Sequence, residues 1–149
     1  MKNVGFLILH IDNSNTMQAL LSSIQTIINK DPHNHYVVFT SSIDAVIHNT
    51  IPVLHMDYAK YFYGDIWCFD IHGLQLNKVF HNSKILYYAT DTPWLENYLP
   101  YTKWINILAD PRINIITNSQ ELYDLYDICW QQPKAIMENF SYDKIKEFI

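Results

Sequence analysis

The chain has 149 residues, a length that suits one domain with a sizeable core. About half of the residues are apolar, which argues against disorder, and the formal net charge is −5. An acidic chain with scattered Lys and Arg residues is a poor match for nucleic acid, because phosphate binding rests mostly on those cations. We therefore expect a single domain over residues 1–149 and no nucleic-acid partner.

The apolar runs of the sequence indicate where the protein resides and whether its cysteines are buried. No run approaches the ~18 residues of a membrane span, and the run at 4–10 is too short and too quickly polar for a signal peptide. Cys68 and Cys129 lie in the apolar runs WCF and ICW without C-x-x-C spacing. This usage predicts two buried thiols in a reducing compartment. We expect a cytoplasmic protein without a membrane span.

In the first half of the chain, apolar runs predict strands at 4–10, 36–41, 51–55 and 66–71. Between the first two, residues 16–30 carry apolar side chains at helical spacing, which predicts one amphipathic helix with a buried face. Asn15 or Thr16 is expected to cap its start, and Asp31-Pro32 to end it.

In the second half, strands are predicted at 84–89, 113–117 and 134–138. A helix is expected from about 93, with Pro93 at its first position, and another around Trp104, ended by Asp110-Pro111. A further helix begins near 118, where Asn118 and Glu121 fit an N-cap and its partner three residues later.

Continuous apolar runs are typical of strands that are covered on both faces, as in a parallel sheet. Strands that alternate with helices predict a Rossmann-like α/β/α three-layer sandwich with a mainly parallel sheet of about six or seven strands. The order of the strands in the sheet does not follow from these patterns.

Ligands of open α/β sheets bind at the carboxyl ends of the strands, where this chain places polar side chains. The candidate binding residues are His10, Asn13, Asn15, His72, Thr90, Asn118 and Ser119, and Asp91 is the candidate catalytic carboxylate. Helix caps require the same residue types, so each position also has a structural reading. For Asp91, helix capping and base catalysis are equally good interpretations.

Several familiar motifs are missing from the sequence. The loop HIDNSNT contains no glycine, which argues against close packing of a dinucleotide pyrophosphate. P-loop, G-x-S-x-G and H-E-x-x-H patterns are absent as well. His33 and His35 form an H-x-H pair without further ligands nearby in sequence. No metal or cofactor is expected.

The order of these units resembles the N-terminal, acceptor-side half of a GT-B glycosyltransferase over nearly the whole chain. The resemblance rests on NVGFLILHIDNSNTMQALLSSI, GDIWCFDIHG, KILYYATDTPWL, INIITNSQELYDLYD and PKAIMENFSYDKIKEF, and the last two are the most specific. The composition is also similar to that of the retaining glucosyltransferases of T4-like phages. The glycine-rich first loop of many members is missing, and Thr90 stands where a His would precede the acid.

The resemblance implies a chain that binds an acceptor and needs a donor domain or a partner chain to hold the nucleotide-sugar. Asp91 would then be the carboxylate that activates or orients the acceptor hydroxyl. His10, Asn13, Asn15 and His72 would line the acceptor pocket, and Asn118 and Ser119 would present a helix N-terminus to a phosphate or hydroxyl group. The alternative is a non-catalytic Rossmann-like binding or interaction protein, in which exposed Tyr and Trp side chains form an interface, most simply a homo-oligomer.

Overall fold

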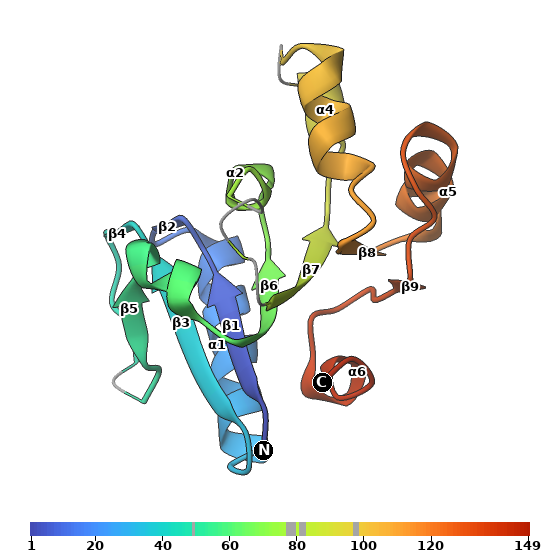
Figure 1. Cartoon of the computed structure of the whole chain (residues 1–149). Helices are drawn as coiled ribbons and strands as arrows, with labels where there is room; N and C mark the ends of the chain where they lie inside the picture. The colour runs from blue at the N-terminus through green and yellow to red at the C-terminus, as the bar shows by residue number, and fades with distance from the viewer. Residues whose placement is uncertain (49, 77–79, 81–82, 97–98) are drawn as a thin grey trace.

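A computed structural model of the chain describes residues 1–48, 50–76, 80, 83–96 and 99–149. Its centre is a seven-stranded sheet in the order β5-β3-β1-β6-β7-β8-β9, and each neighbouring pair is parallel. This confirms the predicted α/β fold with a parallel sheet (Figure 1). The strands are β1 (Asn3–Leu7), β3 (His35–Thr40), β5 (Val53–His55), β6 (Gly64–Cys68), β7 (Ser83–Ala89), β8 (Ile113–Thr117) and β9 (Ala135–Ile136).

The strand order is that of a doubly wound sheet. From the central β1 the chain proceeds outward through β3 to β5, and it then returns to the other side of β1 and proceeds through β6, β7, β8 and β9. The direction of progress therefore reverses between β1 and β6. Two strand ends diverge at such a point, and the crevice between them is where open α/β sheets bind ligands.

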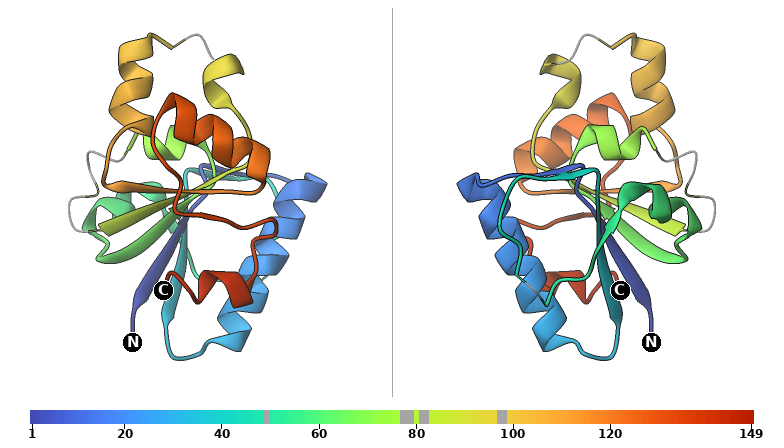
Figure 2. Two further views of the ribbon diagram at one scale, coloured as in Figure 1. Left: turned by 90° about the vertical axis from the view of Figure 1, so that its right-hand side faces the viewer. Right: turned by 90° about the vertical axis from the view of Figure 1, so that its left-hand side faces the viewer.

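Helices cover both faces of the sheet, which gives three layers (Figure 2). One face packs against α1 (Asn15–Lys30) and α6 (Tyr142–Ile145). The other packs against η1 (Met56–Tyr61), α2 (Ile71–Leu74), α3 (Pro93–Glu96), α4 (Tyr101–Leu108) and α5 (Gln120–Cys129). Successive side chains of a strand point to opposite faces, so that Phe6 joins the α1 layer and Leu7 the other.

Helix α1 has the amphipathic face that its sequence predicts. Leu21, Ile24 and Ile27 are buried against the sheet. The expected cap is wrong, because Ser14 caps the helix: its Oγ accepts a hydrogen bond from the Met17 N–H at 3.2 Å. Asn15 and Thr16, the expected caps, are exposed residues of the first turn.

Three other sequence predictions need correction. The expected strand at 4–10 ends at Leu7, and His10–Ile11 form a separate strand, β2, which pairs in parallel with β4 (Ser42–Ile43). Ser119 caps α5 in place of Asn118, because its Oγ accepts from the Leu122 N–H at 3.3 Å. Cys68 is buried as expected, but Cys129 is exposed.

The segment after β9 crosses the sheet face that α1 also covers. Phe140 lies against Trp67 with ring centroids 5.3 Å apart, and the Ile145 side chain is fully buried. The Lys2 Nζ donates a hydrogen bond to the Ile149 carbonyl at 2.7 Å, so the two ends of the chain meet beside α1 (Figure 2). This segment therefore belongs to the core, and it also forms one wall of the site described next.

Candidate functional site

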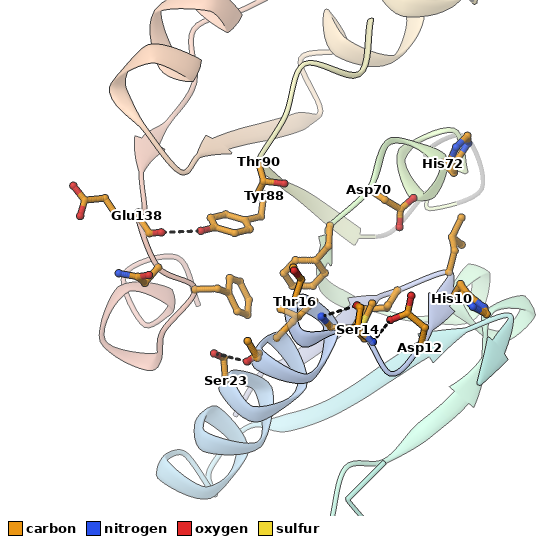
Figure 3. Close-up of a pocket in the computed structure, with 18 residues that line it drawn as sticks. His10, Asp12, Ser14, Thr16, Ser23, Asp70, His72, Tyr88, Thr90 and Glu138 are labelled. Atoms are coloured by element: carbon orange, nitrogen blue, oxygen red, sulfur yellow. Dashed lines mark hydrogen bonds between the residues drawn. The ribbon is translucent and has the colours of Figure 1, made fainter. Parts of the chain in front are cut away.

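A cavity of about 660 Å³ lies at the point where the strand order reverses. Its walls come from the chain after β1, the first turns of α1, the ends of β6 and β7, and the segment after β9 (Figure 3). Elements from both halves of the sequence thus meet at the carboxyl edge of the sheet. This is the position at which a doubly wound sheet binds a small molecule.

The cavity brings together only part of the predicted site. His10, His72 and Thr90 line it, each at the end of a different strand. The other predicted residues are absent from its lining, namely Asn13, Asn15, Asp91, Asn118 and Ser119. The sequence predicts that the strand ends share an edge, but only those next to the reversal point share the cavity.

His10 is held on the small β2–β4 ribbon at the edge of the cavity. Its Nδ1 lies 2.6 Å from the Ser42 Oγ, and its Nε2 lies 3.6 Å from the Asp44 Oδ2. Asn13 supports the same ribbon, because its Nδ2 donates to the Asp44 carbonyl oxygen at 3.1 Å. Both ring nitrogens of His10 therefore have partners on the ribbon.

Asp91 directly follows Thr90, which lines the cavity. Its carbonyl oxygen accepts a hydrogen bond from the Tyr126 hydroxyl at 3.3 Å, whereas its carboxylate caps no described backbone N–H group. Partial burial raises the pKa of this carboxyl group, and the nearby charges of Glu96 and Asp70 raise it further. The catalytic role of Asp91 stays a prediction.

Asn118 and Ser119 have structural contacts at the end of β8. The Asn118 N–H donates to the Ala89 carbonyl at 3.2 Å, and the Ser119 carbonyl accepts from the Thr117 hydroxyl at 3.2 Å. With the Ser119 hydroxyl engaged as the cap of α5, the local structure explains Ser119 without a ligand.

The N-terminus of α1 faces the cavity, and Asp12 and Ser14 make hydrogen bonds beside it. The Ser14 N–H donates to the Asp12 Oδ1 at 2.8 Å, and the Ser14 Oγ caps Met17. The hydrogen bonds from the Ser14 side chain and backbone lower the pKa of Asp12, and His10 adds to this effect. A charged carboxylate thus sits where many Rossmann-like sheets bind a phosphate.

The cavity is lined by acidic side chains without a permanent cation. Asp12 and Asp70 contribute carboxylates, whereas the Glu138 carboxylate points away from the cavity (Figure 3), and none of the described lining residues is Lys or Arg. Asp70 is half-buried, and its Oδ1 accepts from the Gly73 N–H at 2.7 Å (Figure 3). The polar residues after the strands already include Asp12 and Asp70, whereas Glu138 enters through the segment after β9, which sequence reasoning did not place here.

Three aromatic rings form the apolar wall of the cavity. The Phe69 and Phe140 centroids lie 4.8 Å apart at 82°, and Tyr88 lies 5.4 Å from Phe140. The Tyr88 hydroxyl donates to the Met137 carbonyl at 2.9 Å, which ties the wall to the segment after β9. Sequence reasoning missed all three rings, because Phe69 and Tyr88 lie in apolar runs, Phe140 follows β9, and only the tertiary fold brings them to one cavity.

Over residues 1–48, 50–76, 80, 83–96 and 99–149, no three His, Cys, Asp or Glu side chains are grouped so as to bind a metal ion. In the same part of the chain, no helix has the length and apolar character needed to cross a membrane. Comparisons with protein-family models, curated proteins and solved structures give no match.

A second hollow, of about 520 Å³, lies between α3, α4 and the end of α5. Its lining is apolar and largely aromatic, with Trp94 and Trp130 centroids 5.6 Å apart and Tyr101 5.7 Å from Trp130. Tyr101 and Ile128 are 67% and 82% exposed. We call this surface the aromatic groove; it contains none of the predicted site residues.

Proposed function

We propose that the chain is the acceptor-binding half of a GT-B-type glycosyltransferase, which transfers a sugar from a nucleotide-sugar once a donor domain or partner chain is joined to it. The acceptor would occupy the cavity between the ends of β1 and β6. The parallel, doubly wound sheet is consistent with the resemblance, although the fold alone does not determine the function.

One observation carries the proposal: the cavity at the reversal point suits hydroxyl groups and disfavours phosphate. Its carboxylates accept hydrogen bonds from hydroxyl groups, and its described lining has neither Lys nor Arg to pair with a diphosphate. Asp12 accepts from the Ser14 N–H just before α1 and so places a negative charge near the helix N-terminus, which would repel a phosphate. These features favour an acceptor over a nucleotide-sugar in this half.

The chemistry follows from the positions of the acidic residues. A general base must lie within hydrogen-bond reach of the hydroxyl that attacks the donor sugar. Asp70 lines the cavity, whereas Asp91 follows the lining residue Thr90 and has a pKa that partial burial raises. Rings such as Phe69 and Tyr88 offer apolar surface to the C–H faces of a sugar.

Thermal unfolding of the full chain tests this assignment. Because a ligand that binds the folded state raises the unfolding midpoint by mass action, free sugars should raise it. Uridine diphosphate at the same concentration should leave it unchanged. A shift with uridine diphosphate and none with sugars would place a nucleotide in the cavity and refute the acceptor assignment.

A second candidate is a non-catalytic interaction protein, and the aromatic groove favours it. Exposed Trp and Tyr side chains are enriched at protein interfaces. The mass of the chain in solution separates the two proposals. A stable oligomer that dissociates in the Tyr101→Ala or Ile128→Asp variant, together with no sugar binding, would support the interaction protein.

A further inference from the structure

The charge of the cavity bears on the chemical class of the acceptor. Asp12 and Asp70 are the half-buried carboxylates in its lining, and each uses an oxygen to accept a backbone N–H. Among the described residues, no side chain donates a hydrogen bond to the remaining oxygen of Asp70. A partly desolvated carboxylate is stabilised by a cation, and none of the described residues that line the cavity is Lys or Arg.

Neither histidine of the lining pairs with Asp70, although the Ser14 hydrogen bonds and, to a smaller extent, His10 lower the pKa of Asp12. The two nitrogens of His10 lie against Ser42 and Asp44 on the β2–β4 ribbon, so any positive charge on this ring already has a carboxylate partner. His72 is exposed at the edge of the cavity, in the first turn of α2. Neither ring donates to Asp12 or Asp70.

The aromatic wall is a second feature that suits a cation. Phe69, Tyr88 and Phe140 line the same cavity, and aromatic side chains attract ammonium groups through the negative faces of their rings. Carboxylates on one side and aromatic rings on the other make an environment that binds a protonated amine and disfavours an anion. A purely neutral ligand would leave the carboxylate charge unpaired.

We propose that the ligand of this cavity carries a protonated amine that pairs with Asp70 and Asp12, so that the acceptor is an amino sugar or a similar hydroxylated amine. This inference rests on the proposed function, since it names the acceptor class of the same site. Asp70 is the specificity-determining residue, because it reaches into the cavity from the end of β6 opposite the α1 N-terminus (Figure 3).

Calorimetric titration of the full chain with three probes tests the inference. Glucosamine should bind at least about tenfold more tightly than glucose, since a hydrogen bond to a charged group is worth roughly 1.5–3 kcal/mol. N-acetylglucosamine, in which the amine is a neutral amide, should lose that advantage. Asp70→Asn should bring the ratio of glucosamine affinity to glucose affinity close to one.

The matched control is Asp57→Asn, which removes one negative charge from an exposed residue that pairs with His55, away from the cavity. It should keep the preference for glucosamine. Equal binding of glucose and glucosamine would overturn the amine inference and leave the acceptor function standing. Binding of the diamine putrescine without binding of any sugar would support the amine site and overturn the acceptor function. Binding of none of these probes would overturn both.

Discussion

Tyr88→Phe is the most informative single change, because the Tyr88 hydroxyl joins β7 to the segment that forms one wall of the cavity. The hydroxyl donates to the Met137 carbonyl at 2.9 Å and lies 3.4 Å from the Glu138 carbonyl, and the ring is 8% exposed. Burial also raises the pKa of this hydroxyl, so it stays a donor at neutral pH. Its removal leaves the Met137 carbonyl buried without that partner.

The expected cost follows from the buried carbonyl. An unsatisfied buried acceptor costs about 1–3 kcal/mol, and we expect roughly 1–2 kcal/mol here because the ring itself is retained. For a chain of this length that is a fall of about 2–8 °C in the unfolding midpoint. Urea unfolding should give the same loss with an unchanged m value.

Two comparisons make the Tyr88→Phe result decisive. Tyr58→Phe is the matched control, because Tyr58 is 59% exposed, and it should change the free energy of unfolding by less than about 0.5 kcal/mol. Amide hydrogen exchange around Met137 should accelerate in Tyr88→Phe alone. A loss no larger than that of the control, with unchanged exchange at Met137, would refute the role of this hydrogen bond.

Two further predictions concern the ends of helices and strands. Ser14→Ala should lower the free energy of unfolding by about 1 kcal/mol in urea, because it removes the α1 cap. Asn15→Ala is the control and should lower it clearly less. Equal losses in the two variants would contradict the assignment of the cap to Ser14. Asp91→Asn should keep the fold and, at neutral pH, raise the free energy of unfolding, because partial burial, Glu96 and Asp70 penalise the ionised carboxylate in the folded state. That gain should be full above the raised pKa, shrink as the pH falls toward the ordinary value of 3.8, and vanish below it. A gain that grows in acid would contradict the direction of the shift. In an assembled transferase, Asp91→Asn should abolish sugar transfer, and full activity would rule out its catalytic role.

Most helices and strands of this fold could be predicted from local sequence patterns. The helix at 16–30 has its buried stripe, and Pro93 opens α3 as expected. Cap positions were wrong by one or two residues, since neighbouring Ser, Asn and Thr side chains compete for the same N–H groups and only the turn geometry decides among them. At α1 that geometry depends on the hydrogen bond between Asp12 and Ser14.

The site was less predictable, because its composition depends on the order of the strands. His10, His72 and Thr90 share the cavity since β1, β6 and β7 lie next to one another, whereas Ser119 follows β8, one strand farther out. No local pattern encodes that order. The wall after β9 was missed for the same reason, since Phe140 reaches the cavity only when the segment crosses back over the sheet.

The most direct measurement is an amide NMR titration of the full chain with glucosamine and, separately, with uridine diphosphate. We predict that glucosamine shifts the resonances of residues around the cavity, such as Leu9, Thr16, Asp70 and Thr90, and that uridine diphosphate shifts none of them. Shifts with uridine diphosphate at the α1 N-terminus, or sugar shifts confined to the aromatic groove, would contradict an acceptor site between β1 and β6.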